Sequence, residues 1–345
     1  MSEEKSADIE PRAPRSTTAL YGHREAEHVL LDAYRSGRFP HAWLLSGPSG
    51  IGKATLAYRS ARFLLANPNH HENAVQSACS LAVNDSHPAV RRIAAQAEGN
   101  LLVLERTINE KTGKLRQDIA VEDVRRTVSF FGSTAAADGW RIAIVDSVDE
   151  LNPQGANALL KILEEPPRRS VLLLVSHSPG RVLPTIRSRC RVISLRPLSS
   201  EDVARAAAEA VAEPSDAAEI VAAAQAAEGS VRRALALLGA DALDLRSRTI
   251  TLLDRLPALD HRALHVLGDR LFGTEPAVLA AFIDTVNGWL SARLAETQQP
   301  LARLDRWAAI WEQFNAAARD VADYNLERKP LVFNVFAWLA DASHR

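Results

Sequence analysis

Five short apolar runs in the first 197 residues constrain the fold more than any other feature of this sequence. They occupy residues 42–45, 101–104, 142–145, 172–175 and 192–195. Because these runs are mostly apolar rather than alternating, they predict strands buried on both faces, as in a parallel sheet. Helical patterns lie between them, with one apolar face formed by Val121, Val124, Val128 and Phe131 and another by Ala156, Leu159, Leu160 and Leu163. This alternation predicts an α/β fold with a five-stranded parallel sheet covered by helices.

After Pro197 the sequence contains no convincing strand pattern. Three alanine-rich stretches, at 200–212, 216–228 and 230–239, predict short helices, and about five longer helices follow. We expect breaks between the longer helices at Pro257, at 273–276, at 298–300 and at 329–330. The predicted organisation is therefore a disordered tail (1–16), an α/β nucleotide-binding-like domain (17–197), a helical lid (198–241) and an all-α C-terminal domain (242–345).

Composition excludes several classes of function. The chain has 41 basic and 42 acidic residues, so its net charge gives no support for strong stand-alone binding to nucleic acid. Two cysteines cannot build a disulfide framework or a four-cysteine zinc site. Residues 1–16 lack the apolar core of a signal peptide, and no apolar run is long enough to span a membrane. We therefore expect a cytoplasmic protein.

A phosphate-binding loop follows the first apolar run. Residues 47–54 read GPSGIGKA, which is the G-x-x-x-x-G-K spacing of a Walker A loop between a strand and a helix. Gly47, Gly50 and Gly52 would let backbone N–H groups surround phosphate oxygens, and Lys53 would reach the β- and γ-phosphates. The next position normally carries the Ser or Thr hydroxyl that holds Mg²⁺, and here it is Ala54.

The third apolar run ends in Asp146, where a Walker B aspartate would lie beside the phosphate loop. The next residue is Ser147, and a neutral hydroxyl is too weak a base to polarise the attacking water. Asp149 and Glu150 follow nearby, and we interpret them as an exposed pair of charges. The two losses together predict weak binding of ATP or ADP, weak or no binding of Mg²⁺, and no efficient hydrolysis.

Two further motifs identify a family. Residues 157–167 read NALLKILEEPP, and residues 183–190 read LPTIRSRC. With these motifs, residues 20–240 resemble the delta-prime family of bacterial DNA polymerase III clamp-loader subunits, which are AAA+ proteins with a P-loop NTPase-like sheet. The resemblance implies that Arg189 is an arginine finger, supplied in trans to the ATP of a neighbouring motor subunit. It also implies a sensor-2 contact with nucleotide by Arg232 and an oligomerisation collar over 242–345.

Each of these roles has a plainer alternative. Arg189 could pair with a local carboxylate, and Arg187 is a competing candidate for the finger. Arg232 could be a solvent-facing residue at the start of a helix. Ser176 and His177 lie where a sensor of the γ-phosphate would be expected, and a simple strand-end role fits them equally well.

The sequence departs from the family in one segment. Many members of the family carry a four-cysteine zinc module between the loop helix and the second strand, where this chain keeps only Cys79. His70, His71 and His87 lie close to it in sequence, and we interpret them as loop residues. We therefore predict no zinc or other structural metal in residues 67–100.

The leading hypothesis is an ATPase-deficient clamp-loader subunit of the DNA polymerase III holoenzyme. Its partners would be the gamma/tau motor and delta subunits and, indirectly, the sliding clamp and primer–template DNA, with no membrane involved. One alternative is an active AAA+ ATPase, either a loader motor subunit or a branch-migration helicase. A second is a free-standing DNA-binding protein with a vestigial nucleotide fold.

Overall fold

The computed structural model describes residues 12–107, 116, 118–132, 139–211, 216–238, 240–271, 276–294, 301–324 and 326–344. The chain forms two compact units. Unit 1 comprises Met1–Ser215 and Glu228–Arg232, and unit 2 comprises Asp216–Ala227 and Arg233–Arg345. The predicted lid, 198–241, therefore has residues in both units.

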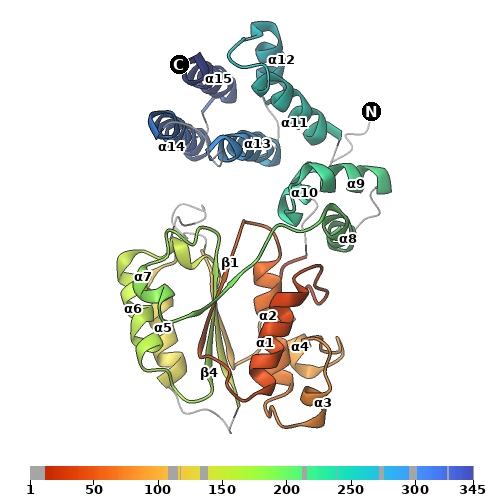
Figure 1. Cartoon of the computed structure of the whole chain (residues 1–345), viewed down its shortest axis with the longest axis vertical. Helices are drawn as coiled ribbons and strands as arrows, with labels where there is room; N and C mark the ends of the chain where they lie inside the picture. The colour runs from red at the N-terminus through yellow and green to blue at the C-terminus, as the bar shows by residue number, and fades with distance from the viewer. Residues whose placement is uncertain are drawn as a thin grey trace. The chain divides into compact units, whose positions relative to one another are not determined.

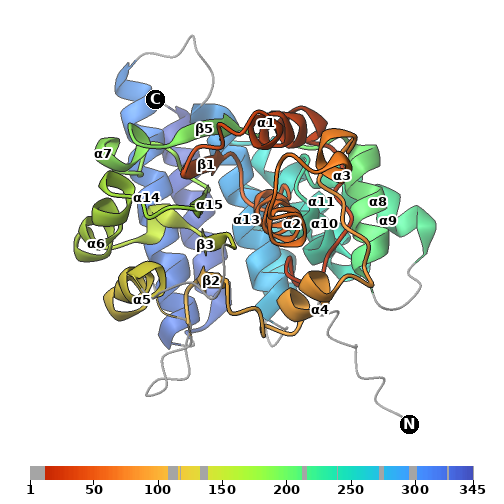
Figure 2. The same ribbon diagram turned by 90° about the horizontal axis from the view of Figure 1, so that it is seen from below.

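Unit 1 is built on a parallel sheet of five strands. These are β1 (Ala42–Ser46), β2 (Leu101–Leu104), β3 (Arg141–Val145), β4 (Ser170–Ser176) and β5 (Arg191–Ser194), in the order β2-β3-β4-β1-β5. Figure 2 labels β2, β3, β1 and β5 in this sequence across the sheet. All four strand pairings are parallel, and the register places Ser46 level with both Ser176 and Ser194. The five predicted strands are confirmed, because each observed strand contains or overlaps one of the apolar runs.

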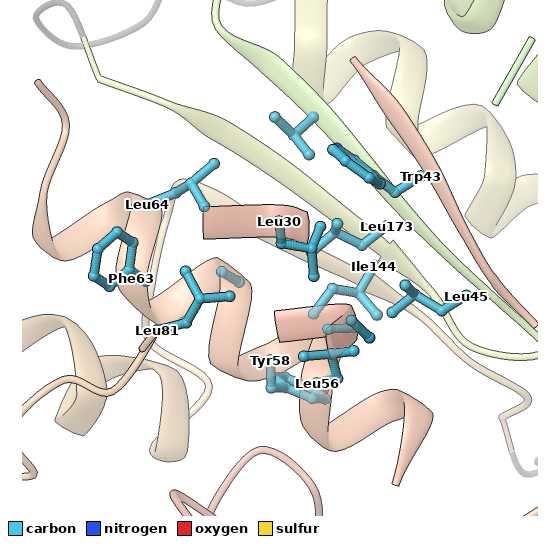
Figure 3. Close-up of a cluster of buried hydrophobic side chains, with 14 of the residues drawn as sticks. Leu30, Trp43, Leu45, Leu56, Tyr58, Phe63, Leu64, Leu81, Ile144 and Leu173 are labelled. Carbon is cyan, nitrogen blue, oxygen red and sulfur yellow. The ribbon is translucent and has the colours of Figure 1, made fainter. Parts of the chain in front are cut away.

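Four helices cover one face of this sheet. They are α1 (Arg24–Arg35), α2 (Lys53–Ala66), α3 (Asn73–Gln76) and α4 (Pro88–Ala94) (Figure 1). Side chains from α1 and α2 pack against Trp43 and Leu45 of β1 and their neighbours on β3 and β4 in one buried cluster (Figure 3). Burying such large apolar side chains is the main contribution to stability here.

The opposite face is covered by α5 (Val121–Gly132), α6 (Pro153–Glu164) and α7 (Pro184–Arg187), with a 3₁₀ turn, η1 (Val148–Glu150), after β3 (Figure 1). The predicted face of α5 needs one correction. Val128 is 47% exposed, whereas Thr127 is fully buried. The Thr127 hydroxyl donates to the carbonyl of Val124 at 2.5 Å, so this polar side chain enters the core with its hydrogen bond made inside its own helix.

The segment that lacks the zinc-module cysteines is held by side chains of α1. The buried carboxylate of Glu27 accepts a hydrogen bond from the backbone N–H of Leu81 at 2.9 Å. Arg35 donates from Nε to the carbonyl of Val75 at 3.0 Å and also donates to the carbonyl of Ala78. Val75 and Leu81 are buried, so the segment contributes to the core as well.

The ligands for a metal do not come together in this segment. Cys79 is exposed, and the described residues contain no group of three or more His, Cys, Asp or Glu side chains that could hold an ion. The residues described here therefore do not fit a zinc module. At the start of the described chain, Arg62 of α2 is buried and donates to the carbonyls of Pro14, Arg15 and Thr17.

All described elements after β5 are helices, as the sequence predicted. They are α8 (Ser200–Ala210), α9 (Ala217–Ala226), α10 (Val231–Leu237), α11 (Ala240–Leu253), α12 (His261–Leu271), α13 (Pro276–Leu294), α14 (Leu301–Tyr324) and α15 (Arg328–His344). The core of unit 2 contains Phe282, Phe314 and Phe336, all fully buried.

The breaks between the longer helices can be compared with the predicted ones only in part. The predicted break at 329–330 is placed a few residues too late: α14 ends at Tyr324 and α15 begins at Arg328, so Pro330 lies in the first turn of α15, where a missing N–H costs little. The predicted breaks at 273–276 and 298–300 fall mostly outside the described residues.

Among the described helices, none combines the length and the apolar character that a bilayer crossing requires.

Candidate nucleotide site and arginine finger

The phosphate loop connects β1 to α2 at the carboxyl edge of the sheet. Gly47, Gly50 and Gly52 all have φ between +76° and +151°, and Gly52 precedes the first residue of α2. At Gly50 the requirement for glycine is steric as well as conformational. A Cβ built there would lie 2.3 Å from Ser230 Oγ and 2.6 Å from Arg232 Cβ. The loop therefore has the backbone form predicted for phosphate binding.

Lys53 is directed back onto its own loop. Its Nζ donates to the carbonyl of Gly47 at 2.8 Å and to that of Pro48, and the residue is only 2% exposed. Burial lowers the Lys53 pKa from 10.5 to about 8, although the charges of Asp146 and Asp149 act in the opposite direction. A bound anion would favour the charged amine, so the lysine is chemically suited to a phosphate.

The shifted pKa predicts a pH-dependent stability. Between about pH 8 and 10.5 the unfolded chain binds more protons at Lys53 than the folded chain, so stability rises with pH across this window. We expect the free energy of unfolding of the natural protein, relative to Lys53→Met, to increase by about 2 kcal/mol from pH 7 to pH 10. Urea unfolding of both proteins at the two pH values measures this. A difference that stays constant with pH would contradict the burial of a charged amine.

The magnesium ligands of the site are incomplete. Ala54 occupies the first turn of α2 without a hydroxyl, and Asp146 follows β3. The pKa of Asp146 is raised above its ordinary value, mainly by burial and then by the charge of Glu105, although the charge of Lys53 acts in the opposite direction. Ser147 is buried, and its φ of 67° gives it a left-handed conformation directly before η1. With one carboxylate and no hydroxyl at the usual positions, these residues fit Mg²⁺ poorly.

The interpretation of Asp149 and Glu150 as an exposed pair is wrong. Asp149 is buried, and its carboxylate accepts from the backbone N–H groups of His177 at 3.0 Å and Ser178 at 3.1 Å. Glu150 forms an ion pair with Arg106 at 2.9 Å. Asp149 therefore ties η1 to the end of β4 through one hydrogen bond to each of its carboxylate oxygens.

The end of β4 carries the two polar residues that the sequence suggested as a possible sensor. The Ser176 hydroxyl and His177 Nδ1 are buried without hydrogen-bond partners among the described residues. The His177 pKa is lowered to about 4, mainly by burial and then by the positive charge of Lys53, with Asp149 acting in the opposite direction. His177 is therefore neutral at physiological pH and lies within electrostatic range of the loop lysine.

The start of α10 lies against the phosphate loop through its backbone. The carbonyl of Gly50 accepts from the backbone N–H of Val231 at 2.9 Å and from that of Arg232 at 3.4 Å. The Arg232 side chain is exposed. The structure thus brings Arg232 to the loop through its backbone, while its guanidinium remains accessible to solvent.

Arg189 lies on the surface between α7 and β5. Its Nη2 contacts Glu164 Oε1 at 2.8 Å, and its Nη1 donates to the carbonyl of Thr185 at 2.9 Å. The side chain is 36% exposed, and that of Glu164 is 50% exposed. The local carboxylate that the plainer alternative required is therefore present, and the competing Arg187 is exposed as well.

Strand direction separates Arg189 from the phosphate loop of its own chain. The loop follows the carboxyl end of β1, whereas Arg189 precedes the amino end of β5, and the two strands are parallel neighbours. Trp43 is level with Arg191 and Ser46 with Ser194. The four aligned residue pairs alone span about 10 Å at about 3.3 Å per residue, and Arg189 and the loop lie beyond opposite ends of them. Arg189 therefore lies at the end of the strands away from its own loop.

Comparison with known proteins identifies relatives of this arrangement. A profile of the family described as DNA polymerase III, delta subunit, matches residues 22–199, which is more than half of the 345 residues. DNA polymerase III subunit delta' of Pseudomonas aeruginosa is 40% identical over 152 residues, covering 44% of this chain and 41% of the relative. The corresponding subunit of Escherichia coli is 31% identical over 214 residues, covering 61% and 58%.

Gamma/tau subunits and solved structures are also similar to this chain. DNA polymerase III subunit gamma/tau of Mycobacterium tuberculosis is 32% identical over 178 residues, covering 51% of this chain and 28% of the relative. A gamma subunit-related protein of Thermotoga maritima aligns in structure with a TM-score of 0.42 at 17% identity, covering 93% of this chain and all of that chain. The chain thus spans only about two fifths to three fifths of the delta' relatives. By its sequence over residues 22–199, this chain belongs to the DNA polymerase III delta subunit family, with delta' proteins among its relatives.

Proposed function

We propose that this chain is a subunit of the bacterial clamp loader that helps place the sliding clamp on primed DNA during replication. It hydrolyses little or no ATP and completes the ATP site of a neighbouring motor subunit with Arg189. One observation carries the proposal: an exposed arginine lies at the sheet edge away from its own phosphate loop. A guanidinium there could reach a triphosphate bound by a neighbouring subunit, whereas it could not reach one bound by the loop of its own chain.

The ATPase deficiency rests on three positions. Ala54 removes a magnesium ligand, Ser147 replaces the acid that would polarise water, and Asp149 is engaged by two backbone N–H groups. Restoring one group would leave the others missing. Positioning of water and metal contributes most of the catalysis of phosphoryl transfer, so loss of both leaves little turnover.

Weak binding of ATP or ADP is compatible with the loop. Its N–H groups and Lys53 would hold the phosphates, and the bound nucleotide would supply the negative charge that favours a protonated lysine. The carbonyl bonds of Lys53 to Gly47 and Pro48 compete with such binding. We expect this role in the cytoplasm, with gamma/tau and delta subunits as direct partners and the clamp and primer–template DNA as indirect ones.

The experiment that tests this proposal compares ATP hydrolysis by the purified chain, by motor and delta subunits without it, and by the complete mixture. We expect near-background turnover by the chain alone and stimulated turnover in the mixture. Brisk magnesium-dependent hydrolysis by the isolated chain would contradict the proposal and indicate an active AAA+ ATPase. A mixture that neither assembles nor gains activity would remove the clamp-loader assignment.

A further inference from the structure

We propose that Glu164 is a positioning residue that holds the Arg189 guanidinium ready for the neighbouring subunit. The inference rests on the proposed function, because it assumes that Arg189 acts in trans. Glu164 ends α6, whereas Arg189 follows α7, so the contact joins two separate elements of unit 1. It has a second anchor in the carbonyl of Thr185, which accepts from the other Nη atom.

The two hydrogen bonds orient the guanidinium and leave some of its N–H donors available. One Nη2 donor goes to Glu164 and one Nη1 donor to Thr185, while the planar fork has further N–H donors. Arginine otherwise has many rotamers, and ordering it only when the subunits meet would cost conformational entropy. A guanidinium fixed beforehand presents its remaining donors to phosphate oxygens with less of this cost.

The position of Glu164 is not explained by the stability of α6. The carboxyl end of a helix is its negative end, where a carboxylate is unfavourable. The pair with Arg189 is substantially exposed, and exposed ion pairs contribute little to folding. Glu165 lies next to it at the same end and is also exposed, yet the bond to Arg189 comes from Glu164. The contact is therefore better suited to orienting the arginine than to stabilising the fold.

The charge of Glu164 also has an opposing effect on the arginine. A carboxylate bonded to the arginine reduces its positive charge, and it would repel an approaching triphosphate. In that case Glu164 would act as a latch, and its removal would increase hydrolysis. We assign the positioning role because a second, uncharged anchor at Thr185 shares the same geometry, which a latch would not need.

The test uses the complete loader reconstituted with Glu164→Ala in this chain. We expect kcat to fall about tenfold at the site next to Arg189, as is usual when a group supporting a functional side chain is removed, with KM for ATP changed less than about twofold. Glu164→Gln keeps an oxygen that can accept the hydrogen bond and should restore most of the activity. Glu165→Ala is the matched control and should behave like the natural protein.

A double-mutant cycle separates the possible failures. In the Arg189→Ala background, Glu164→Ala should have no additional effect, because the two residues act as one unit. If Arg189→Ala lowers activity while Glu164→Ala does not, the positioning role alone is wrong. If neither change lowers it, the proposed function itself fails. Increased activity in Glu164→Ala, or a loss that persists in the Arg189→Ala background, would also overturn the positioning role.

Discussion

If Arg189 acts in trans as proposed, its replacement by alanine should remove most of the hydrolysis at the one ATP site that a neighbouring subunit would form against this chain. The expected loss at that site is on the order of 10³-fold, because a guanidinium supplied in trans stabilises the charge of the transition state. Arg189 is exposed and paired only with Glu164 and Thr185 in the described structure, so the variant should fold and assemble normally. The cost to stability should be within about 1 kcal/mol.

The effect is best measured in a single turnover of the reconstituted complex. The other motor sites should continue to react, so the amplitude of the fast phase should fall by the share of one site. Arg187→Ala is the matched control, since Arg187 is exposed in the same short helix. Arg189→Lys should rescue little, because an ammonium lacks the planar fork. An unchanged amplitude in an assembled Arg189→Ala complex would show that Arg189 has no role in trans.

Replacement of Gly229 by alanine should destabilise unit 1 by about 3 kcal/mol. Gly229 has a φ of +82°, and a Cβ there would lie 2.5 Å from Pro197 Cβ and 2.7 Å from the backbone N of Leu198. The carbonyl of Gly229 also accepts from that N–H at 3.1 Å. Backbone atoms cannot move aside cheaply, so the substitution should displace the start of α10 from the phosphate loop.

Chemical denaturation of the two proteins measures the loss of stability directly. Gly99→Ala is the matched control, because a Cβ at Gly99 meets no atom within 4 Å and its φ is not in the left-handed region. We expect the control to remain within about 0.5 kcal/mol of the natural protein. A comparably small effect in Gly229→Ala would contradict the close approach of Gly229 and Leu198.

The sheet was predictable because its signal is local. A strand buried on both faces needs a continuous apolar run, and each of the five runs is visible without knowledge of its neighbours. The order of the strands is not visible in this way, because it depends on contacts between distant segments. Thr127 shows a further limit: its polar side chain is buried because the hydroxyl bonds to its own helix, so polarity alone gave the wrong helix face.

The candidate site was predictable only where a motif fixes the residues. The loop glycines and Lys53 occur at a fixed spacing, and Arg189 lies in the recognisable motif at 183–190. The role of Asp149 could not be predicted, because its partners are backbone N–H groups 28 and 29 residues further along the chain. The partner of Arg189 was hidden for the same reason, since Glu164 precedes it by 25 residues.

The parallel direction of β1 and β5 has a consequence for assembly. A subunit that accepts an arginine at its phosphate loop and donates its own arginine from the other end of the strands joins its neighbours head to tail. It uses two different surfaces rather than one self-complementary patch. In such a row, every working ATP site needs a receiver from one chain and a donor from the next. A chain whose receiving end is impaired while its donating end is intact contributes fully only as the last member, so it would fix where the series of active sites stops.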